Sequence, residues 1–256
     1  MTSRAPDWTA GLRSAPHICV LGGGFGGLYT ALYLQRLVKR HGPDGRPPLR
    51  ITLVEPKERF LFTPLLYEVI TGELQPWHIA PSYGKLLGAT AVQVRRALVQ
   101  GVDLDRRLVS LDSGETLDYD YLVLAVGSRN RLAVDGAASH AQPFRSLADA
   151  ELLNERLWEL EASGRSSQIA VIGGGPNGIE IACKLADRLG DRTQIHLIDR
   201  GDRLLKTFSI GSQRAANRAL AQRGVRLHLE TGVEAIAADR VTLSQNGQPF
   251  DLPADL

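Results

Sequence analysis

Two stretches of the chain share one order of apolar and polar positions. Residues 17–21 and 168–172 are short apolar runs. Each run leads through a Gly-rich stretch into a segment with apolar residues at helical spacing, at 28–40 and at 179–186. A short buried strand followed directly by an amphipathic helix is the repeating unit of a parallel α/β sheet. The pattern therefore predicts an α/β fold with two Rossmann-like dinucleotide-binding domains.

Both Gly-rich stretches have the spacing G-x-G-x-x-G, and they begin 151 residues apart (173 − 22). The glycines are Gly22, Gly24 and Gly27 in the first copy and Gly173, Gly175 and Gly178 in the second. In such a fingerprint the first glycine permits a tight turn, the second lets a pyrophosphate approach the backbone, and the third lets helix and strand pack closely. The helix N-terminus then offers N–H groups to the phosphates. Two copies, each between a strand and a helix, are a far more specific signal than one.

An acidic residue ends the next predicted strand in each copy. Residues 50–55 end in Glu55, and residues 194–199 end in Asp199. A carboxylate at this place accepts hydrogen bonds from ribose hydroxyls. The acids follow the first glycine by 33 residues (55 − 22) and 26 residues (199 − 173), against a usual spacing of about 20. The turn-rich insert at 41–48 accounts for the longer first spacing.

The rest of the pattern predicts further elements and the domain boundaries. The predicted strands are an antiparallel meander at 92–99, 102–104 and 108–111 with its turn at 112–115, a buried strand at 117–126, and strands at 225–229 and 241–243. The predicted helices are 147–162, with Ser146 as its N-cap, and 209–222. We expect a mobile arm at 1–15, a first nucleotide-binding domain at 16–145 and a second at 146–256.

Composition and charge narrow the class of protein. With 43% hydrophobic and 23% charged residues the chain is typical of a globular protein. The net charge of +2, from 30 basic and 28 acidic residues, argues against a nucleic-acid partner. No apolar run is long enough for a transmembrane helix, and the N-terminus lacks a signal peptide. Attachment to a membrane surface stays open, because an amphipathic helix needs no such run.

Cysteine and histidine chemistry is not expected. Cys19 lies in the first predicted strand and Cys183 in the second fingerprint helix, so both are interpreted as packing residues and no disulfide framework is possible. The histidines show no spacing typical of metal ligands, so we predict no metal site. They are His17, His41, His78, His140, His196 and His228.

Residues 59–74, after the first acid, resemble a known family of flavoproteins. The stretch FTPLLYE at 62–68 is similar to the type II (alternative) NAD(P)H:quinone dehydrogenases, which have two dinucleotide-binding domains. The continuation QPWHIAP at 75–81 resembles the demethylphylloquinone reductase branch. Residues 55–74 contain no cysteine, unlike the disulfide reductases of the same superfamily. The resemblance covers about residues 16–256.

The resemblance implies which residues bind which cofactor. FAD would be bound by Gly22, Gly24, Phe25, Gly26, Gly27, Glu55, Val99 (through its backbone) and Gly127. NADH or NADPH would be bound by Gly173, Gly175, Asn177, Gly178, Asp199 and Arg200. Val126 stands where the family usually has Thr, so any hydroxyl role is lost there. The Asp199 carboxylate favours NADH because it would repel a 2′-phosphate, whereas Arg200 could pair with that phosphate, so both nucleotides stay open.

The activity implied by the resemblance is hydride transfer from NAD(P)H to FAD, followed by reduction of a quinone. Thr63, Pro64 and Glu180 would lie beside the reacting rings; for Glu180 the alternative is an acid placed for the dipole of its helix. Two other functions stay open: a non-catalytic nucleotide-binding module, and a soluble flavoprotein reductase for a protein acceptor. The quinone itself, for example a demethylphylloquinone or plastoquinone, is not identified by the sequence.

The family continues beyond the point that matches residue 256. Its members carry a further Gly turn, a Gly-Asp motif for the FAD ribityl chain and C-terminal amphipathic helices. We therefore expect C-terminally incomplete domains and weak or absent FAD binding by this chain alone. For the full-length protein we expect a possible homodimer, on the cytoplasmic side of a thylakoid or plasma membrane or in the cytoplasm.

Overall fold

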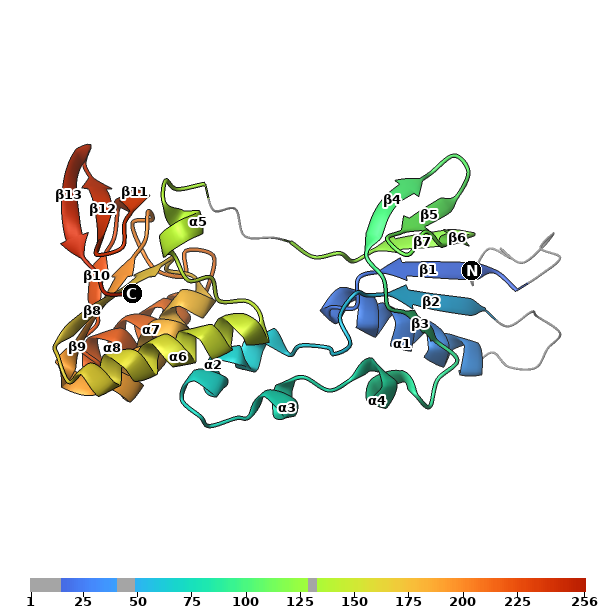
Figure 1. The fold of residues 1–256 in the computed structure, drawn as a ribbon, viewed down its shortest axis with the longest axis horizontal. Helices are drawn as coiled ribbons and strands as arrows, with labels where there is room; N and C mark the ends of the chain where they lie inside the picture. Colours follow the sequence, from blue (N-terminus) through green and yellow to red (C-terminus); the bar gives the residue numbers. More distant parts are fainter. Residues whose placement is uncertain (1–14, 41–48, 129–132) are drawn as a thin grey trace. The chain divides into compact units, whose positions relative to one another are not determined.

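The computed structural model describes residues 15–40, 49–128 and 133–256, and the chain forms two compact units (Figure 1). The first unit comprises residues 1–61 and 80–129, and the second comprises residues 62–79 and 130–256. Nearly all of the predicted arm and the whole predicted insert at 41–48 lie outside the described residues.

A four-stranded parallel sheet in the order β3-β2-β1-β7 forms the centre of the first unit. Its strands are β1 (His17–Leu21), β2 (Arg50–Val54), β3 (Gln93–Arg95) and β7 (Tyr121–Leu124). Helix α1 (Phe25–Arg40) packs on β1 and β2. All of β1 is buried because strands pair with it on both edges and other elements pack on its faces, which explains the unbroken apolar run that predicted it.

A three-stranded antiparallel sheet packs on one face of β1. Its strands are β4 (Val99–Asp103), β5 (Leu108–Leu111) and β6 (Thr116–Asp118). Cys19 and Leu21, which alternation places on the same face of β1, pack against Val109 and Leu111. The predicted meander is therefore correct in kind, but residues 93–95 do not belong to it, because they pair with β2 as strand β3.

The prediction of one buried strand over 117–126 is wrong. The chain turns at Tyr119 and Asp120, whose N–H groups donate to the carbonyls of Arg107 (3.1 Å) and His17 (2.9 Å). Residues before this turn form β6 in the antiparallel sheet, and residues after it form β7 beside β1. Leu124 is 67% exposed, since β7 is the last strand in the order of its sheet.

The second unit combines a parallel and an antiparallel sheet. The parallel sheet β10-β9-β8 consists of β8 (Ser167–Ile172), β9 (Thr193–Ile198) and β10 (Arg226–His228). The antiparallel sheet consists of β11 (Thr231–Ile236), β12 (Arg240–Gln245) and β13 (Gln248–Pro253). The longer helices are α6 (Leu147–Ser163), α7 (Pro176–Leu189) and α8 (Ile210–Gln222), and the short ones are α5 (Ala137–His140) and a 3-10 turn (Gly190–Arg192). Strands β11 and β13 were not predicted, whereas the strands at 225–229 and 241–243 are confirmed as β10 and β12.

The core of the second unit lies between its helices and the parallel sheet. Leu157 of α6, Leu185 of α7, Leu197 of β9 and Leu220 of α8 are almost fully buried in one cluster. Ser146 caps α6 as predicted, in a capping box in which its hydroxyl accepts from the N–H of Asp149. These contacts hold the second fingerprint between β8 and α7.

Residues 62–79 belong to the second unit, although the predicted boundary at 145/146 assigned them to the first. The segment holds a 3-10 helix (Thr63–Leu65), α2 (Leu66–Ile70) and α3 (Pro76–Ile79), whereas α4 (Tyr83–Leu87) belongs to the first unit. Helix α2 packs on α6 and α7 and buries Leu66, Val69 and Ile70 there. The boundary differs because this apolar face packs on helices that begin 81 residues (147 − 66) and 110 residues (176 − 66) further along the chain.

Candidate functional site: two glycine fingerprints and a cavity

The first fingerprint forms the turn that the sequence predicts. Gly22 has φ +97°, and a Cβ there would lie 2.3 Å from the Ala125 carbonyl oxygen, so only glycine fits. A Cβ on Gly27 would lie 1.7 Å from the Gly22 carbonyl oxygen. The first glycine thus permits the turn, and the third permits the close approach of α1 to β1.

The second fingerprint repeats this geometry. Gly173 has φ +114°, and a Cβ on Gly178 would lie 1.8 Å from the Gly173 carbonyl oxygen. Gly175 is the N-cap of α7, and Asn177 follows in its first turn. The same steric reasons therefore place glycine at corresponding positions in both units.

The middle glycine of each fingerprint faces open space. A Cβ on Gly24 or on Gly175 would have no heavy atom within 4 Å. Nothing in the packing of either unit therefore demands glycine there, whereas the approach of a pyrophosphate to the backbone does. The residues present fit a dinucleotide at both turns, FAD or NAD(P)H by chemistry.

The two predicted ribose acids also hold the fingerprint loops. The Glu55 carboxylate accepts a hydrogen bond of 2.6 Å from the N–H of Gly23, and the Asp199 carboxylate accepts one of 2.6 Å from the N–H of Gly174. The other oxygen of Asp199 accepts from the N–H of Gly201 (2.6 Å). Each acid is thereby fixed beside its glycine turn and keeps lone pairs with which it could accept hydrogen bonds from ribose hydroxyls.

Sequence reasoning missed the groups that hold the carbonyls of these loops. In the first unit the buried hydroxyl of Tyr83 donates to the Gly23 carbonyl (2.7 Å), and burial raises the pKa of this phenol. In the second unit the N–H of Leu205, a non-glycine residue with φ +51°, donates to the Gly174 carbonyl (3.3 Å). No local pattern could have found Tyr83, since it acts on a residue 60 positions away.

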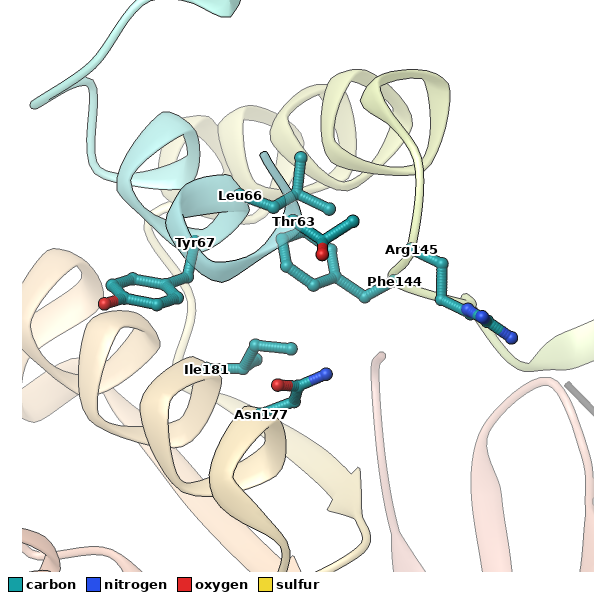
Figure 2. Close-up of a pocket in the computed structure, with 7 residues that line it drawn as sticks. All are labelled: Thr63, Leu66, Tyr67, Phe144, Arg145, Asn177 and Ile181. Carbon is teal, nitrogen blue, oxygen red and sulfur yellow. The ribbon is translucent and has the colours of Figure 1, made fainter. Parts of the chain in front are cut away.

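A cavity of about 140 Å³ lies beside the second fingerprint (Figure 2). Figure 2 shows side chains from the start of α2 on one side and from the start of α7 on the other. The lining residues are Thr63, Leu66, Tyr67, Phe144, Arg145, Asn177 and Ile181. The structure thus brings together Thr63, predicted to be catalytic, and Asn177, predicted to bind the nucleotide. Pro64 is exposed beside Thr63 and does not line the cavity.

Glu180 lies in α7 between two lining residues, Asn177 and Ile181. Burial raises the pKa of the Glu180 carboxyl, and the negative charge of Glu68 on α2 raises it further. Burial, then the charges of Glu180 and Glu68, also raise the pKa of the Tyr67 phenol. The first turns of α7 and helix α2 therefore form an environment in which carboxyl and phenol groups hold their protons more readily.

The other predicted site residues take the following places. Phe25 begins α1, with its ring 5.1 Å from that of Phe60, and Gly26 follows it. Val99 begins β4 and packs against the cluster that contains Leu21 and Val54, the residues before Gly22 and Glu55. Gly127 has φ +73° just after β7. Arg200 is exposed at the start of the loop that follows Asp199.

The described residues give little support to thiol chemistry, a metal site or a membrane-spanning helix. Cys19 is fully buried and burial raises its pKa to about 11, while Cys183 packs partly buried against the second core. Within residues 15–40, 49–128 and 133–256, no group of three His, Cys, Asp or Glu side chains could hold a metal ion. The same part of the chain contains no helix with the length and apolarity needed to span a bilayer.

The family model for pyridine nucleotide-disulphide oxidoreductases matches residues 16–256, so the chain belongs to this family. It is 42% identical over 247 residues to demethylphylloquinone reductase NdbB from Synechocystis sp., a match that covers 94% of this chain and 60% of that protein. It is 38% identical over 239 residues to the alternative NAD(P)H-ubiquinone oxidoreductase C1 from Arabidopsis thaliana, which covers 86% of this chain and 45% of that protein. The resemblance predicted from residues 59–81 is confirmed by these relatives.

The solved structures support the same fold. NDH2 from Plasmodium falciparum in complex with NADH matches with a TM-score of 0.81 and 20% identity, over 94% of this chain and 54% of that one. At this identity the likeness shows the fold alone, and together with the family model it confirms the predicted α/β fold of FAD/NAD(P)-binding type. The chain spans about half the length of the relatives that it matches.

Proposed function

We propose that the chain acts as an FAD-dependent NAD(P)H:quinone oxidoreductase. The observation that carries this proposal is the pair of fingerprints. Each has a turn that only glycine can form, an open middle glycine and a carboxylate fixed beside the turn. A single such site would suit many nucleotide-binding proteins, whereas two in one chain suit transfer between two dinucleotides. The names of the similar proteins supply the acceptor class, a quinone.

The first unit binds FAD in this proposal. The backbone at Gly22, Gly24 and Gly27 approaches the pyrophosphate, and Glu55 accepts hydrogen bonds from a ribose. Phe25 and Gly26 supply the first turn of α1, whose N-terminus favours phosphate. Val99 and Gly127 lie at the ends of the strands beside this turn and complete the FAD site through their backbone.

The second unit binds NAD(P)H. Gly173, Gly175 and Gly178 form the phosphate-binding turn, and Asn177 continues it into the cavity. Asp199 favours the free 2′-hydroxyl of NADH, because a carboxylate repels a 2′-phosphate. Arg200 is exposed next to it and offers a guanidinium to NADPH, so both nucleotides remain substrates of the proposal.

When bound, FAD supplies the acceptor for hydride from NAD(P)H and the electron donor for the quinone. The chain's own residues bind and orient the partners. Thr63 lines the cavity, with Pro64 exposed next to it, and Asn177 offers a side-chain amide into the cavity. Burial and the charge of Glu68 raise the pKa of Glu180, next to the lining residue Ile181, and a carboxyl with a raised pKa suits a reaction that ends in protonation of a reduced quinone.

Membrane contact and assembly belong to the same proposal. A quinone acceptor is lipid-soluble, so we infer that the full-length protein works at a membrane surface, and we expect a homodimer. The open quinone class includes demethylphylloquinone, related naphthoquinones and plastoquinone. Vesicle flotation and analytical ultracentrifugation of the full-length protein would test these two inferences.

The proposal is tested on the expressed chain with added FAD. We expect NADH or NADPH to bind, measured by isothermal titration calorimetry. We expect a short-chain naphthoquinone to be reduced when FAD is added in large excess, which offsets the weak FAD binding expected of this chain alone. Gly175→Val is the matched control: Gly175 has φ −78° and its Cβ position is open, so the variant should fold but lose nucleotide binding.

Each alternative function has its own signature in this assay. Nucleotide binding without turnover of any acceptor would favour the non-catalytic module. Reduction of a ferredoxin but not of a quinone would favour the reductase for a protein acceptor. A folded chain that binds neither nucleotide would refute the proposal.

A further inference from the structure

Helix α2 cannot be stable on the strength of its own sequence. It has five residues, Leu66–Ile70, and its N-cap residue Leu65 makes no side-chain cap hydrogen bond. An isolated helix needs about 12–15 residues to be even marginally stable in water. Helix α2 therefore depends on its neighbours, and its lining residues Leu66 and Tyr67 stay in place only while it is held.

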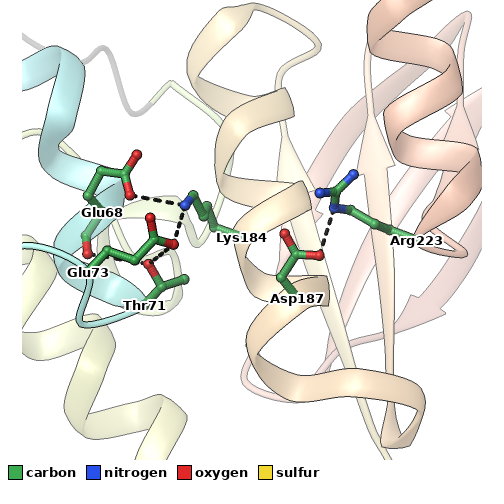
Figure 3. A network of polar contacts seen from close by, with 6 residues as sticks. All are labelled: Glu68, Thr71, Glu73, Lys184, Asp187 and Arg223. Carbon is green, nitrogen blue, oxygen red and sulfur yellow. Dashed lines mark hydrogen bonds and ion pairs between the residues drawn. The ribbon is translucent and has the colours of Figure 1, made fainter.

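Two cations of α7 hold this helix. The ammonium of Lys184 donates to the Glu68 carboxylate at 3.0 Å and also to Glu73, in the turn that follows α2 (Figure 3). One helical turn further on, the guanidinium of Arg188 donates to the carbonyl of Ile70 at 2.6 Å. Arg188 thus satisfies a backbone carbonyl at the C-terminal end of α2, and Lys184 fixes the side chains around it.

The ion pair between Lys184 and Glu68 is partly shielded from water, and the Lys184 ammonium has further contacts. The side chains of Lys184 and Glu68 are only 20% and 18% exposed, so their pairing is less screened than that of a surface ion pair. Burial lowers the pKa of Lys184, but the hydrogen bonds to Glu73 and Glu68 outweigh burial and raise it. The ammonium also lies 5.8 Å from the centre of the Tyr67 ring. Lys184 therefore stays charged and contacts α2 both through an acid and through a lining side chain.

The same helix carries Glu180, one turn before Lys184. Glu180, Lys184 and Arg188 recur at intervals of four residues, so they lie on one side of α7, the side that faces α2. Glu68 influences the Glu180 carboxyl and is itself held by Lys184. Lys184 thus holds in place the acid on α2 whose charge acts on Glu180.

We propose that Lys184 is a positioning residue that fixes α2 against α7 and so preserves the cavity for the nicotinamide end of the dinucleotide. The inference rests on the proposed function for the identity of the ligand. Lys184 does not line the cavity, so it acts through Glu68, Glu73 and Tyr67. Its loss should affect the nicotinamide end of the ligand and spare the adenosine end, which binds at Asp199.

Lys184→Met tests this, because it keeps the apolar stem and removes the charge and the donors. We expect backbone amides of residues 66–70 to exchange hydrogen roughly tenfold faster, since a hydrogen bond to a charged group is lost. We also expect the affinity for NADH to fall roughly tenfold while the affinity for ADP-ribose stays unchanged. Lys184→Arg, which keeps charge and donors, should restore most of both.

The matched control lies on the same helix. Asp187 of α7 accepts from Arg223 at 2.8 Å, in a contact that ties α8 and not α2 to α7 (Figure 3). Arg223→Met therefore removes one ion pair of α7 and should leave exchange at α2 and NADH affinity unchanged. Unchanged exchange in the peptides of β11–β13 shows that each variant is folded.

Three results would overturn the proposal: exchange at α2 in Lys184→Met equal to that of the wild type, equal losses of NADH and ADP-ribose affinity, or the same effects in Arg223→Met. If the wild-type chain binds neither nucleotide, the proposed function fails instead. Exchange at α2 would then still show whether Lys184 holds this helix.

Discussion

Two histidines from neighbouring strands meet inside the second unit and make its stability depend on pH. His196 of β9 and His228 of β10 are stacked, with their ring centres 5.2 Å apart and Nδ1 of His196 2.9 Å from Nε2 of His228. His196 is 2% exposed, and its Nε2 is buried without a hydrogen-bond partner among the described residues. A single proton between Nδ1 of His196 and Nε2 of His228 makes one hydrogen bond. A further proton on the pair would either place two N–H groups against each other or create a buried positive charge.

The magnitude follows from the protonation of the two states. Burial, then the charges of His228 and Arg226, lower the pKa of His196 from 6.5 to about 4. Above about pH 6.5 the imidazole is neutral in folded and unfolded chains alike, so the full stability is present. As the pH falls from 6.5 to 4, the unfolded chain binds a proton that the folded chain does not. The free energy of unfolding then falls by up to ~1.4 kcal/mol per pH unit, or about 2 kcal/mol between pH 7 and pH 5.

His196→Gln removes this titration, so its stability should fall less between pH 7 and pH 5 than that of the wild type. The measurement is urea unfolding followed by tryptophan fluorescence in a Trp8→Phe background, in which Trp77 and Trp158 report on the second unit. His140→Gln is the control, because His140 is exposed in the same unit and should keep the wild-type pH dependence. An NMR titration of the histidine Cε1 protons measures the pKa of His196 directly.

The reasoning would be refuted if wild type and His196→Gln lost the same stability between pH 7 and pH 5, or if His196 titrated near 6.5. The outcome also matters for the nucleotide site. The carbonyl of His228 accepts a hydrogen bond from the N–H of Asp199 at 2.9 Å, so this strand pair supports the acid that we propose to bind the ribose. Dinucleotide affinity of the second unit should therefore weaken over the same acidic range.

Further predictions concern single positions. Gly24→Ala should leave thermal stability unchanged but weaken FAD binding in a flavin titration. Gly27→Ala should lower the free energy of unfolding by roughly 2 kcal/mol or more, because its Cβ would lie 1.7 Å from the Gly22 carbonyl oxygen. Ser146→Ala removes the N-cap of α6 and should lower the free energy of urea unfolding by about 1 kcal/mol, with retained stability contradicting the cap's role. Cys19, fully buried and with its pKa raised to about 11, should react with a thiol reagent at pH 8 only after denaturation; rapid reaction of the native chain would contradict its burial.

Much of the fold follows from patterns that span only a few residues. The strand–glycine–helix order predicted β1 with α1 and β8 with α7, and Ser146 and Ser209 marked the starts of α6 and α8. The sequence pattern failed where an apolar run changes partners, since 117–126 reads as one strand but serves two sheets. The two strands are separated by Tyr119 and Asp120 alone, and the turn between them is set by distant carbonyls, so no turn signal marks the change of sheet.

Of the candidate site, too, one part was predictable from local patterns and another was not. The first and third glycines of each fingerprint were predictable because each requirement, a positive φ or a backbone contact too close for a Cβ, acts at one position and leaves one permitted residue. The acids were predictable because they follow a strand at a known place.

The partners of these groups were not predictable from local patterns. Tyr83 reaches Gly23, and Lys184 reaches Glu68, across 60 and 116 positions. Such contacts depend on which helix faces meet when the units pack, and many pairs of polar residues in the sequence would satisfy the same chemistry. The local sequence was therefore sufficient for the phosphate-binding turns. The packing of α2 on α7, which shapes the cavity, was decided by contacts between elements far apart in the chain.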